Sequence, residues 1–258
     1  PFNFDGLQNN YRYRMLAYQE WRTLYQAGKL NQAQSQFFET RPAEALYHIP
    51  SDPHEVANLA DNPKYNEVVK AMRTRLDEHV KSMPDLSFFP ESHLVDEAFD
   101  NPVTFGRAQQ RLVAELVDIA NLQLIDFAVA KREIEAALRA ENRWKRYWGL
   151  IVCSTHGKAA AGFSKLATTL AKHDEENLVR LRAAEFLAIA GLENSQPIVM
   201  DCLHAARHGV EANLVLNSLV LLRDGATNYQ FEVPANLKKP QPGVAEMQRR
   251  LLYLNSAD

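Results

Sequence analysis

The sequence RYWGLI at residues 146–151 can be aligned with RLRAAE at 180–185 and, more loosely, with ANLVLN at 212–217. The starts of these segments, 146, 180 and 212, are 34 and 32 residues apart. Another apolar stretch of helical periodicity precedes each of them, at residues 129–139, 162–171 and 197–207. Helix pairs that recur at this interval are typical of an α-solenoid, in which each unit buries its apolar face against its neighbours. Ankyrin and tetratricopeptide sequence marks are missing, so we expect HEAT-like helical repeats over residues 103–232.

The first hundred residues have a different pattern. Aromatic and apolar residues recur at helical spacing over 11–30, and a short helix is expected over 32–39. The clearest helix follows Asn62, which can cap free amides, and Pro63, which suits a first helical turn. Between these helices, ALYHI at 45–49 is short, apolar and followed by a proline, which predicts a strand that ends in a turn.

The predicted fold class is therefore mainly α. It consists of a small α+β piece at residues 1–102, the HEAT-like α-solenoid at 103–232, and a Pro-rich connector with a last helix at 233–258. The sequence between Pro84 and Pro102 lacks a regular apolar pattern, and we expect the domain boundary there.

Composition excludes several classes of protein. The 258 residues carry a formal net charge of −3 and a pI near 6.3, which argues against a dedicated nucleic-acid binder. No apolar run approaches the roughly 20 residues that span a bilayer. Cys153 and Cys202 are too few for a disulfide framework, although they leave a single bridge open. The chain opens at Pro1 without a signal-peptide pattern, so we expect a piece of a longer protein.

The sequence contains no convincing catalytic or metal-binding motif. Cys153 and His156 are close enough on a helix to form a nucleophile pair, but a buried thiol beside a helix-end residue is the favoured interpretation. His204 and His208, near Cys202, have the spacing of two zinc ligands but lack a third. The segment around Gly157-Lys158 does not match a phosphate-binding loop.

Two further clusters are better explained by structure than by ligand binding. Trp144 and Trp148 share a helix face beside Lys145 and Arg146, as in a nucleic-acid or sugar platform, yet packing between repeats is the favoured interpretation. The run SDPHE at 51–55 contains acid–base residues, but it more readily forms a turn in which Asp52 caps free amides.

An ordered series of motifs in the first part of the chain resembles a known family. The motifs are YRYR at 11–14, EWR at 20–22, GKLN at 28–31, RPAEALY at 41–47, DPHE at 52–55, NLA at 58–60 and PKY at 63–65. Together they resemble the C-terminal subdomain of bacterial sulfatases of the alkaline-phosphatase superfamily. His48 departs from the pattern, since the family usually has an acidic residue there.

The resemblance implies a parent enzyme that hydrolyses sulfate esters of sulfated glycans, with a formylglycine nucleophile and a calcium ion. No Cys or Ser here is followed by x-Pro-x-Arg, the sequence converted to formylglycine. We therefore expect no catalytic, cofactor-binding or metal-binding residue in this chain, and no turnover of an aryl sulfate by the chain alone. Its function would be to pack against the catalytic domain, with periplasmic or secreted localisation implied by the family.

The expected partner is a catalytic sulfatase domain in cis, and a second copy of the chain and a sulfated glycan are further candidates. Arg12 and Arg14 are the substrate-side candidates, because guanidinium groups suit sulfate oxygens. Surface ion pairs are the alternative role for these arginines. The alternative function is an independent HEAT-like protein-binding scaffold, and a cysteine–histidine hydrolase centred on Cys153 is the third hypothesis.

Overall fold

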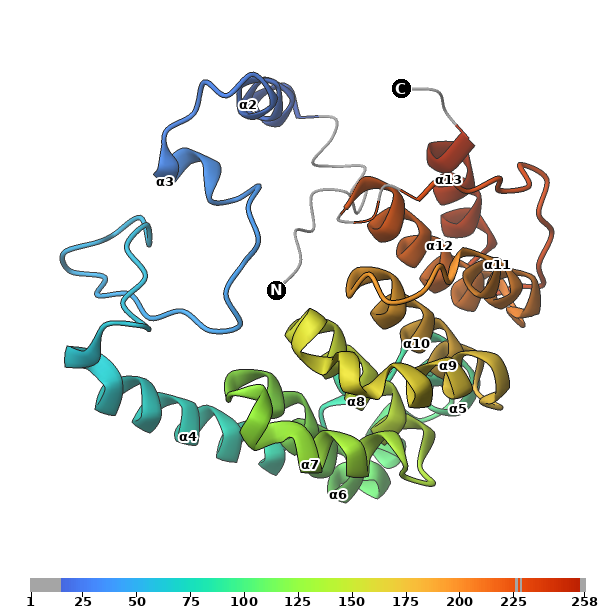
Figure 1. The fold of residues 1–258 in the computed structure, drawn as a ribbon, viewed down its shortest axis with the longest axis horizontal. Coiled ribbons are helices and arrows are strands. Elements are labelled where there is room, and N and C mark those ends of the chain that lie inside the picture. Colours follow the sequence, from blue (N-terminus) through green and yellow to red (C-terminus); the bar gives the residue numbers. More distant parts are fainter. Residues whose placement is uncertain (1–14, 226, 228, 256–258) are drawn as a thin grey trace. The chain divides into compact units, whose positions relative to one another are not determined.

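The computed structural model describes residues 15–225, 227 and 229–255. The chain forms two compact units, Pro1–Asp77 and Glu78–Asp258, which divide inside helix α4 (Asn66–Ser82), upstream of the boundary predicted at residue 102. Every regular element of the described residues is a helix (Figure 1). The predicted mainly-α class is confirmed.

Unit 1 is built around a small aromatic cluster. It contains α2 (Leu16–Gln26), α3 (Gln32–Ser35), the 3₁₀ helix η1 (Pro63–Tyr65) and most of α4. The Phe38 ring stacks on Tyr25 with centroids 4.5 Å apart and meets Trp21 edge-on at 4.8 Å. Trp21 Nε1 also donates to the Gln34 carbonyl at 3.0 Å, which ties α2 to α3.

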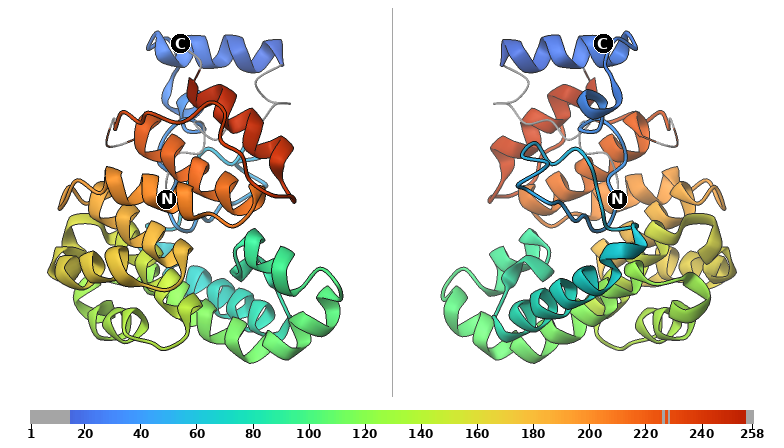
Figure 2. Two further views of the ribbon diagram at one scale, coloured as in Figure 1. Left: turned by 90° about the vertical axis from the view of Figure 1, so that its right-hand side faces the viewer. Right: turned by 90° about the vertical axis from the view of Figure 1, so that its left-hand side faces the viewer.

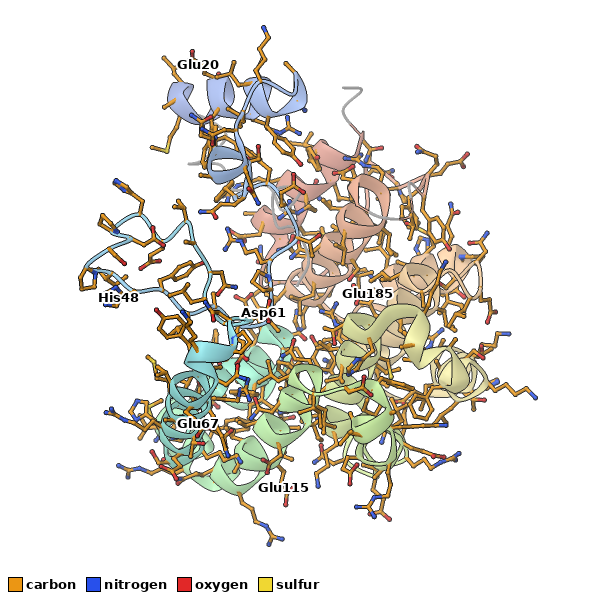
Figure 3. The ribbon with its side chains drawn as sticks, turned by 60° about the vertical axis from the view of Figure 1, so that its left-hand side comes forward. Glu20, His48, Asp61, Glu67, Glu115 and Glu185 are labelled. Atoms are coloured by element: carbon orange, nitrogen blue, oxygen red, sulfur yellow. The ribbon has the colours of Figure 1, made fainter. Side chains whose placement is uncertain are left out.

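The prediction of a strand at 45–49 is wrong. This segment has no regular secondary structure, and its backbone is held by a side chain: Leu46 N donates to Asn58 Oδ1 at 2.9 Å, while Leu59 N donates to Leu46 O at 2.8 Å. A strand needs a neighbouring strand to satisfy its backbone groups, and the described residues supply none. Figure 3 shows His48 on this loop and Glu67 at the start of α4.

Two local predictions in unit 1 are confirmed. Asp52 accepts hydrogen bonds from Val56 N at 3.1 Å and Ala57 N at 2.9 Å, as expected of a turn. Asn62 Oδ1 accepts from Lys64 N at 3.1 Å with Pro63 in the first turn, and the helical region that follows ends at Ser82. These features depend on neighbouring residues only, which is why the sequence predicts them.

Unit 2 is formed by helices that stack in two rows. Its elements are η2 (Leu86–Phe88), α5 (Glu91–Glu97), α6 (Pro102–Asn121), η3 (Leu122–Leu124), α7 (Phe127–Leu138), α8 (Arg143–His156), η4 (Gly157–Phe163), α9 (Ser164–His173), α10 (Asn177–Ile189), α11 (Gln196–Ala205), α12 (Gly209–Asp224) and α13 (Val244–Asn255). Helices α8, α10 and α12 form an inner row, and α7, α9 and α11 form an outer row (Figure 1). Each predicted helix pair is therefore present. The core runs through both rows and includes Leu150, Phe186 and Leu216.

The Pro-rich connector is fixed to the last helix pair. Gly209 N and Val210 N, which begin α12, donate to the carbonyls of Pro240 at 2.9 Å and Pro242 at 3.0 Å. The Lys239 ammonium donates to carbonyls at the end of α11, where it complements the negative end of the helix dipole. Figure 2 shows α13 (dark red) beside α12, and the two helices are in contact.

Candidate functional site

The substrate-side candidates Arg12 and Arg14 lie outside the described residues. Their role therefore stays a prediction.

The two thiols have the properties of core residues. Cys153 and Cys202 are free and fully buried, and burial raises the pKa of each thiol to about 12. The His156 ring meets that of Phe127 edge-on at 5.4 Å, and its Nε2 is 3.1 Å from the Leu122 carbonyl. Thiols with such a pKa are poor nucleophiles at neutral pH, which supports the structural interpretation of Cys153.

The histidine pair is divided between two environments. His204 is exposed in the last turn of α11, whereas His208 is buried and caps α12 by accepting from Glu211 N at 3.3 Å. In the part of the chain that the structure describes, no three His, Cys, Asp or Glu side chains are placed to hold a metal ion.

Trp144 and Trp148 take part in packing. Trp148 Nε1 donates to the Phe88 carbonyl at 2.8 Å, and its ring lies 5.3 Å from that of Phe88. Trp144 lies 4.6 Å from the ring of His93. Both tryptophans pack against the segment before α6 rather than forming an open stacking platform.

His93 is held neutral in this aromatic environment. It is 8% exposed, and its ring contacts those of Trp144 and Phe89, with centroids 4.6 Å and 5.4 Å away. Burial lowers the pKa of His93 to about 4, and the positive charge of Arg143 lowers it further, while Asp96 acts in the opposite direction.

A polar network joins α5, α10 and α12. Arg207 forms an ion pair with Asp96, with Nη1 at 2.7 Å from the carboxylate. Its Nε donates a hydrogen bond to Glu211 at 2.7 Å. The other Glu211 oxygen accepts from Asn177 Nδ2 at 2.7 Å. Glu211 is fully buried, so these two donors stabilise a carboxylate that would otherwise be costly to remove from water.

A second polar cluster occupies the middle of the inner helices. Arg182 Nη2 donates to Tyr147 Oη at 3.0 Å, and its Nη1 pairs with Glu185, which is labelled in Figure 3. Two atoms of this pair, Arg182 Nε and Glu185 Oε1, are buried without a hydrogen-bond partner among the described residues, and so are Asn213 Oδ1 and Asn217 Oδ1 on α12. We call Arg182, Glu185, Asn213 and Asn217 the inner polar cluster.

The sequence analysis missed the inner polar cluster, although its own alignment contains the signal. When 146–151 is placed over 180–185, Arg182 falls where the first repeat has Trp148, and Glu185 falls where it has Ile151. A buried charged pair at positions occupied by apolar residues in another repeat calls for a specific explanation.

Unit 1 exposes a row of apolar side chains on α4. Val68, Met72 and Leu76 recur every four residues and are 46%, 57% and 63% exposed; we call them the α4 stripe. The neighbouring Arg73 forms a bidentate ion pair with Glu44, with Nε at 2.9 Å from Oε2, which fixes the preceding loop to the helix. Of the described unit 1 residues, only Tyr18 and Phe38 are buried hydrophobics, so this unit leaves most of its apolar surface uncovered.

Comparison with known proteins connects part of the chain to a sulfatase. A segment of 96 residues is 36% identical to an ulvan-active sulfatase of Formosa agariphila. The match covers 37% of this chain and 16% of that protein, so the chain spans only a small part of its relative. A region of this chain is thus related to sulfatases. No family model matches the chain. No solved structure matches it either. No described helix is long and apolar enough to cross a membrane.

Proposed function

We propose that this chain is the non-catalytic C-terminal portion of a sulfatase that acts on sulfated glycans. In this proposal unit 1 packs against the catalytic domain, and unit 2 extends it as HEAT-like helical repeats. The parent enzyme would supply the formylglycine and the calcium ion, and it would work in the periplasm or outside the cell.

The α4 stripe is the observation that carries the proposal. Three large apolar side chains in line on one helix are the pattern of a face that packs against another surface. Full burial of such a side chain stabilises an interface by about 1.5–3 kcal/mol. The relationship to a sulfatase supports the catalytic domain of that class of enzyme as the surface that covers the stripe.

The chemistry of the chain supports a non-catalytic role. The sequence has no Cys or Ser followed by x-Pro-x-Arg, and both cysteines are buried with a raised pKa. Hydrolysis of the sulfate ester would therefore depend on residues of the catalytic domain.

The test is a charge placed in the α4 stripe. Leu76→Asp and the control Leu252→Asp, a leucine of similar exposure on α13, would be made in the chain joined to its catalytic domain. We expect Leu76→Asp to lower the yield of soluble sulfatase and its thermal midpoint, while Leu252→Asp leaves both near wild type. Equal behaviour of the two variants would contradict docking through α4. A coding sequence without a sulfatase domain upstream would favour the independent scaffold instead.

A further inference from the structure

The inner polar cluster needs a partner that the described chain does not supply. Folded proteins leave few buried polar atoms without a hydrogen bond, because the lost contact with water is not replaced. Among the described residues, α10 and α12 carry five such atoms, and four of them belong to the inner polar cluster; Glu185, which carries one of the four, is 4% exposed. Packing alone does not explain them, since an apolar side chain would fill the same space without this cost.

The helices bring the members of the cluster to one face. The hydrogen bond from Asn177 to Glu211 sets the register between α10 and α12. Arg182 and Glu185 are five and eight positions beyond Asn177, and Asn217 is six positions beyond Glu211. At about 1.5 Å of rise per residue, Asn217 lies at a level between the two charged residues.

The repeat alignment leads to the same arrangement. Glu185 and Asn217 occupy the same position of consecutive repeats, and Ile151 is their counterpart on α8. Residues 148, 182 and 214 share a second position and are all partly exposed. The two positions hold Trp148 and Ile151 on α8, Arg182 and Glu185 on α10, and Leu214 and Asn217 on α12, so the polar residues gather on the last two inner helices.

The kinds of unpartnered atoms in the inner polar cluster indicate which chemical groups a ligand would need. Three of them are acceptor oxygens and one is a donor nitrogen, so the ligand must bring more hydrogen-bond donors than acceptors to this place. A cation would be repelled by Arg182, and an anion by Glu185, while the pair together is neutral. Hydroxyl groups fit, because each donates one hydrogen bond and also accepts.

We propose that Arg182, Glu185, Asn213 and Asn217 bind the hydroxyl groups of an uncharged sugar residue in a polysaccharide. The two asparagine amides and the carboxylate of Glu185 accept from the hydroxyls, and Arg182 Nε donates to a sugar oxygen. The polar atoms are enclosed in this structure, so binding requires side-chain rotation of the kind common at binding surfaces. Asn213, Asn217 and Arg182 are each partly exposed, so parts of these three residues reach the surface.

This inference rests on the proposed function only for the type of polysaccharide. It assigns to unit 2 the recognition of the sugar backbone, whereas the catalytic domain would recognise the sulfate ester. The two roles are separable by mutation, because Leu76→Asp in unit 1 is expected to leave sugar binding unchanged. Failure of docking and failure of sugar binding therefore give different results.

The experiment is calorimetric titration of the 258-residue chain with ulvan oligosaccharides before and after chemical desulfation, at low and high salt. We expect the desulfated oligosaccharides to bind with less than about a twofold change in affinity with salt, since screening affects charged ligands most. Asn217→Leu should weaken binding about three- to tenfold, the effect of one lost hydrogen bond. The control Asp201→Leu, on the exposed side of α11, should bind as the wild type does.

A stability measurement separates a ligand site from a structural one. Asn217→Leu and Asn213→Leu replace amides whose oxygens have no partner, so the urea midpoint should stay equal or rise while sugar affinity falls. The proposal is overturned if desulfated oligosaccharides do not bind, if binding requires sulfate, or if both asparagine variants bind as tightly as the wild type. Binding of an unstructured peptide in place of the sugar would also overturn it.

Discussion

The guanidinium of Arg182 lies over the ring of Tyr147, with 5.1 Å between its central carbon and the ring centroid, and donates to the Tyr147 hydroxyl at 3.0 Å. Two inner helices, α8 and α10, are thus joined by a charge, a ring and a hydrogen bond. Burial opposes the positive charge, but Glu185 and Tyr147 more than compensate and raise the pKa of Arg182. The helices are held together by polar contacts as well as by the apolar core.

Removal of the Tyr147 hydroxyl should weaken this connection. We expect Tyr147→Phe to lower the free energy of unfolding by about 1.5–3 kcal/mol, the usual value of a hydrogen bond to a charged group. The control Tyr229→Phe removes a hydroxyl whose contact to the Glu193 carbonyl is long, at 3.4 Å, and should cost less. Urea denaturation measures the free energy of unfolding of both variants. Equal decreases would show that the hydrogen bond to Arg182 contributes no more than the long contact of Tyr229.

Asp174 is expected to be a sensitive position for stability. Its carboxylate accepts hydrogen bonds from Arg146 Nε at 2.7 Å and Arg146 Nη2 at 2.9 Å, and its side chain is 3% exposed. Because Asp174→Asn leaves a nearly buried guanidinium without its countercharge, we expect a loss of about 3–5 kcal/mol. Glu133→Gln is the matched control, since the Arg132–Glu133 pair lies on the surface and should contribute little. A small effect of Asp174→Asn in thermal unfolding would contradict this account.

Gly209 is required by the close approach of the connector to α12. A Cβ at this position would lie 2.6 Å from both the Gly243 carbonyl carbon and Val244 N, which are backbone atoms that cannot rotate away. We expect Gly209→Ala to destabilise the chain by about 1–3 kcal/mol, as other overpacked sites do. At Gly162 an added Cβ meets nothing within 4 Å, so Gly162→Ala should fold as the wild type does. Limited proteolysis should detect a released connector in Gly209→Ala alone.

His93 should make the stability of unit 2 depend on pH. Its pKa falls from 6.5 to about 4 on folding, so the unfolded chain binds more protons between these values. Stability should therefore be complete above about pH 6.5 and decline as the pH falls toward 4, by an amount on the order of 2 kcal/mol. His93→Phe should reduce the decline, whereas the exposed control His173→Gln should retain it. Urea midpoints at pH 7 and pH 4.5 provide the measurement.

The thiols should be inert in the folded protein. Cys153 and Cys202 are fully buried and their pKa is raised to about 12, so a thiol reagent should label them slowly in buffer and rapidly in denaturant. Fast labelling of Cys153 in the native chain would restore the cysteine–histidine hydrolase hypothesis. Mass spectrometry of the labelled peptides distinguishes the two sites.

Much of the local structure follows from the sequence because it depends on residues close together in the chain. Asn62 and Pro63 start a helical region through a cap and a fixed dihedral angle, and both act within a few residues. The helix pairs follow from apolar periodicity, and the aligned segments at 146–151 and 180–185 lie on the inner helices α8 and α10. The prediction of a strand at 45–49 fails because a strand depends on a partner strand that can be distant in the sequence.

The sequence by itself determined the cap and first turn at Asn62 and Pro63, that helices recur in pairs after residue 103, and that no formylglycine motif is present. Only the tertiary structure decided that Arg182 meets Tyr147, 35 residues away, and that Asn177 donates a hydrogen bond to Glu211 on the next inner helix. The stacking of separate helices sets these relationships, and no local preference encodes it. Only the structure also showed the α4 stripe exposed, because periodicity predicts an apolar face without saying what covers it.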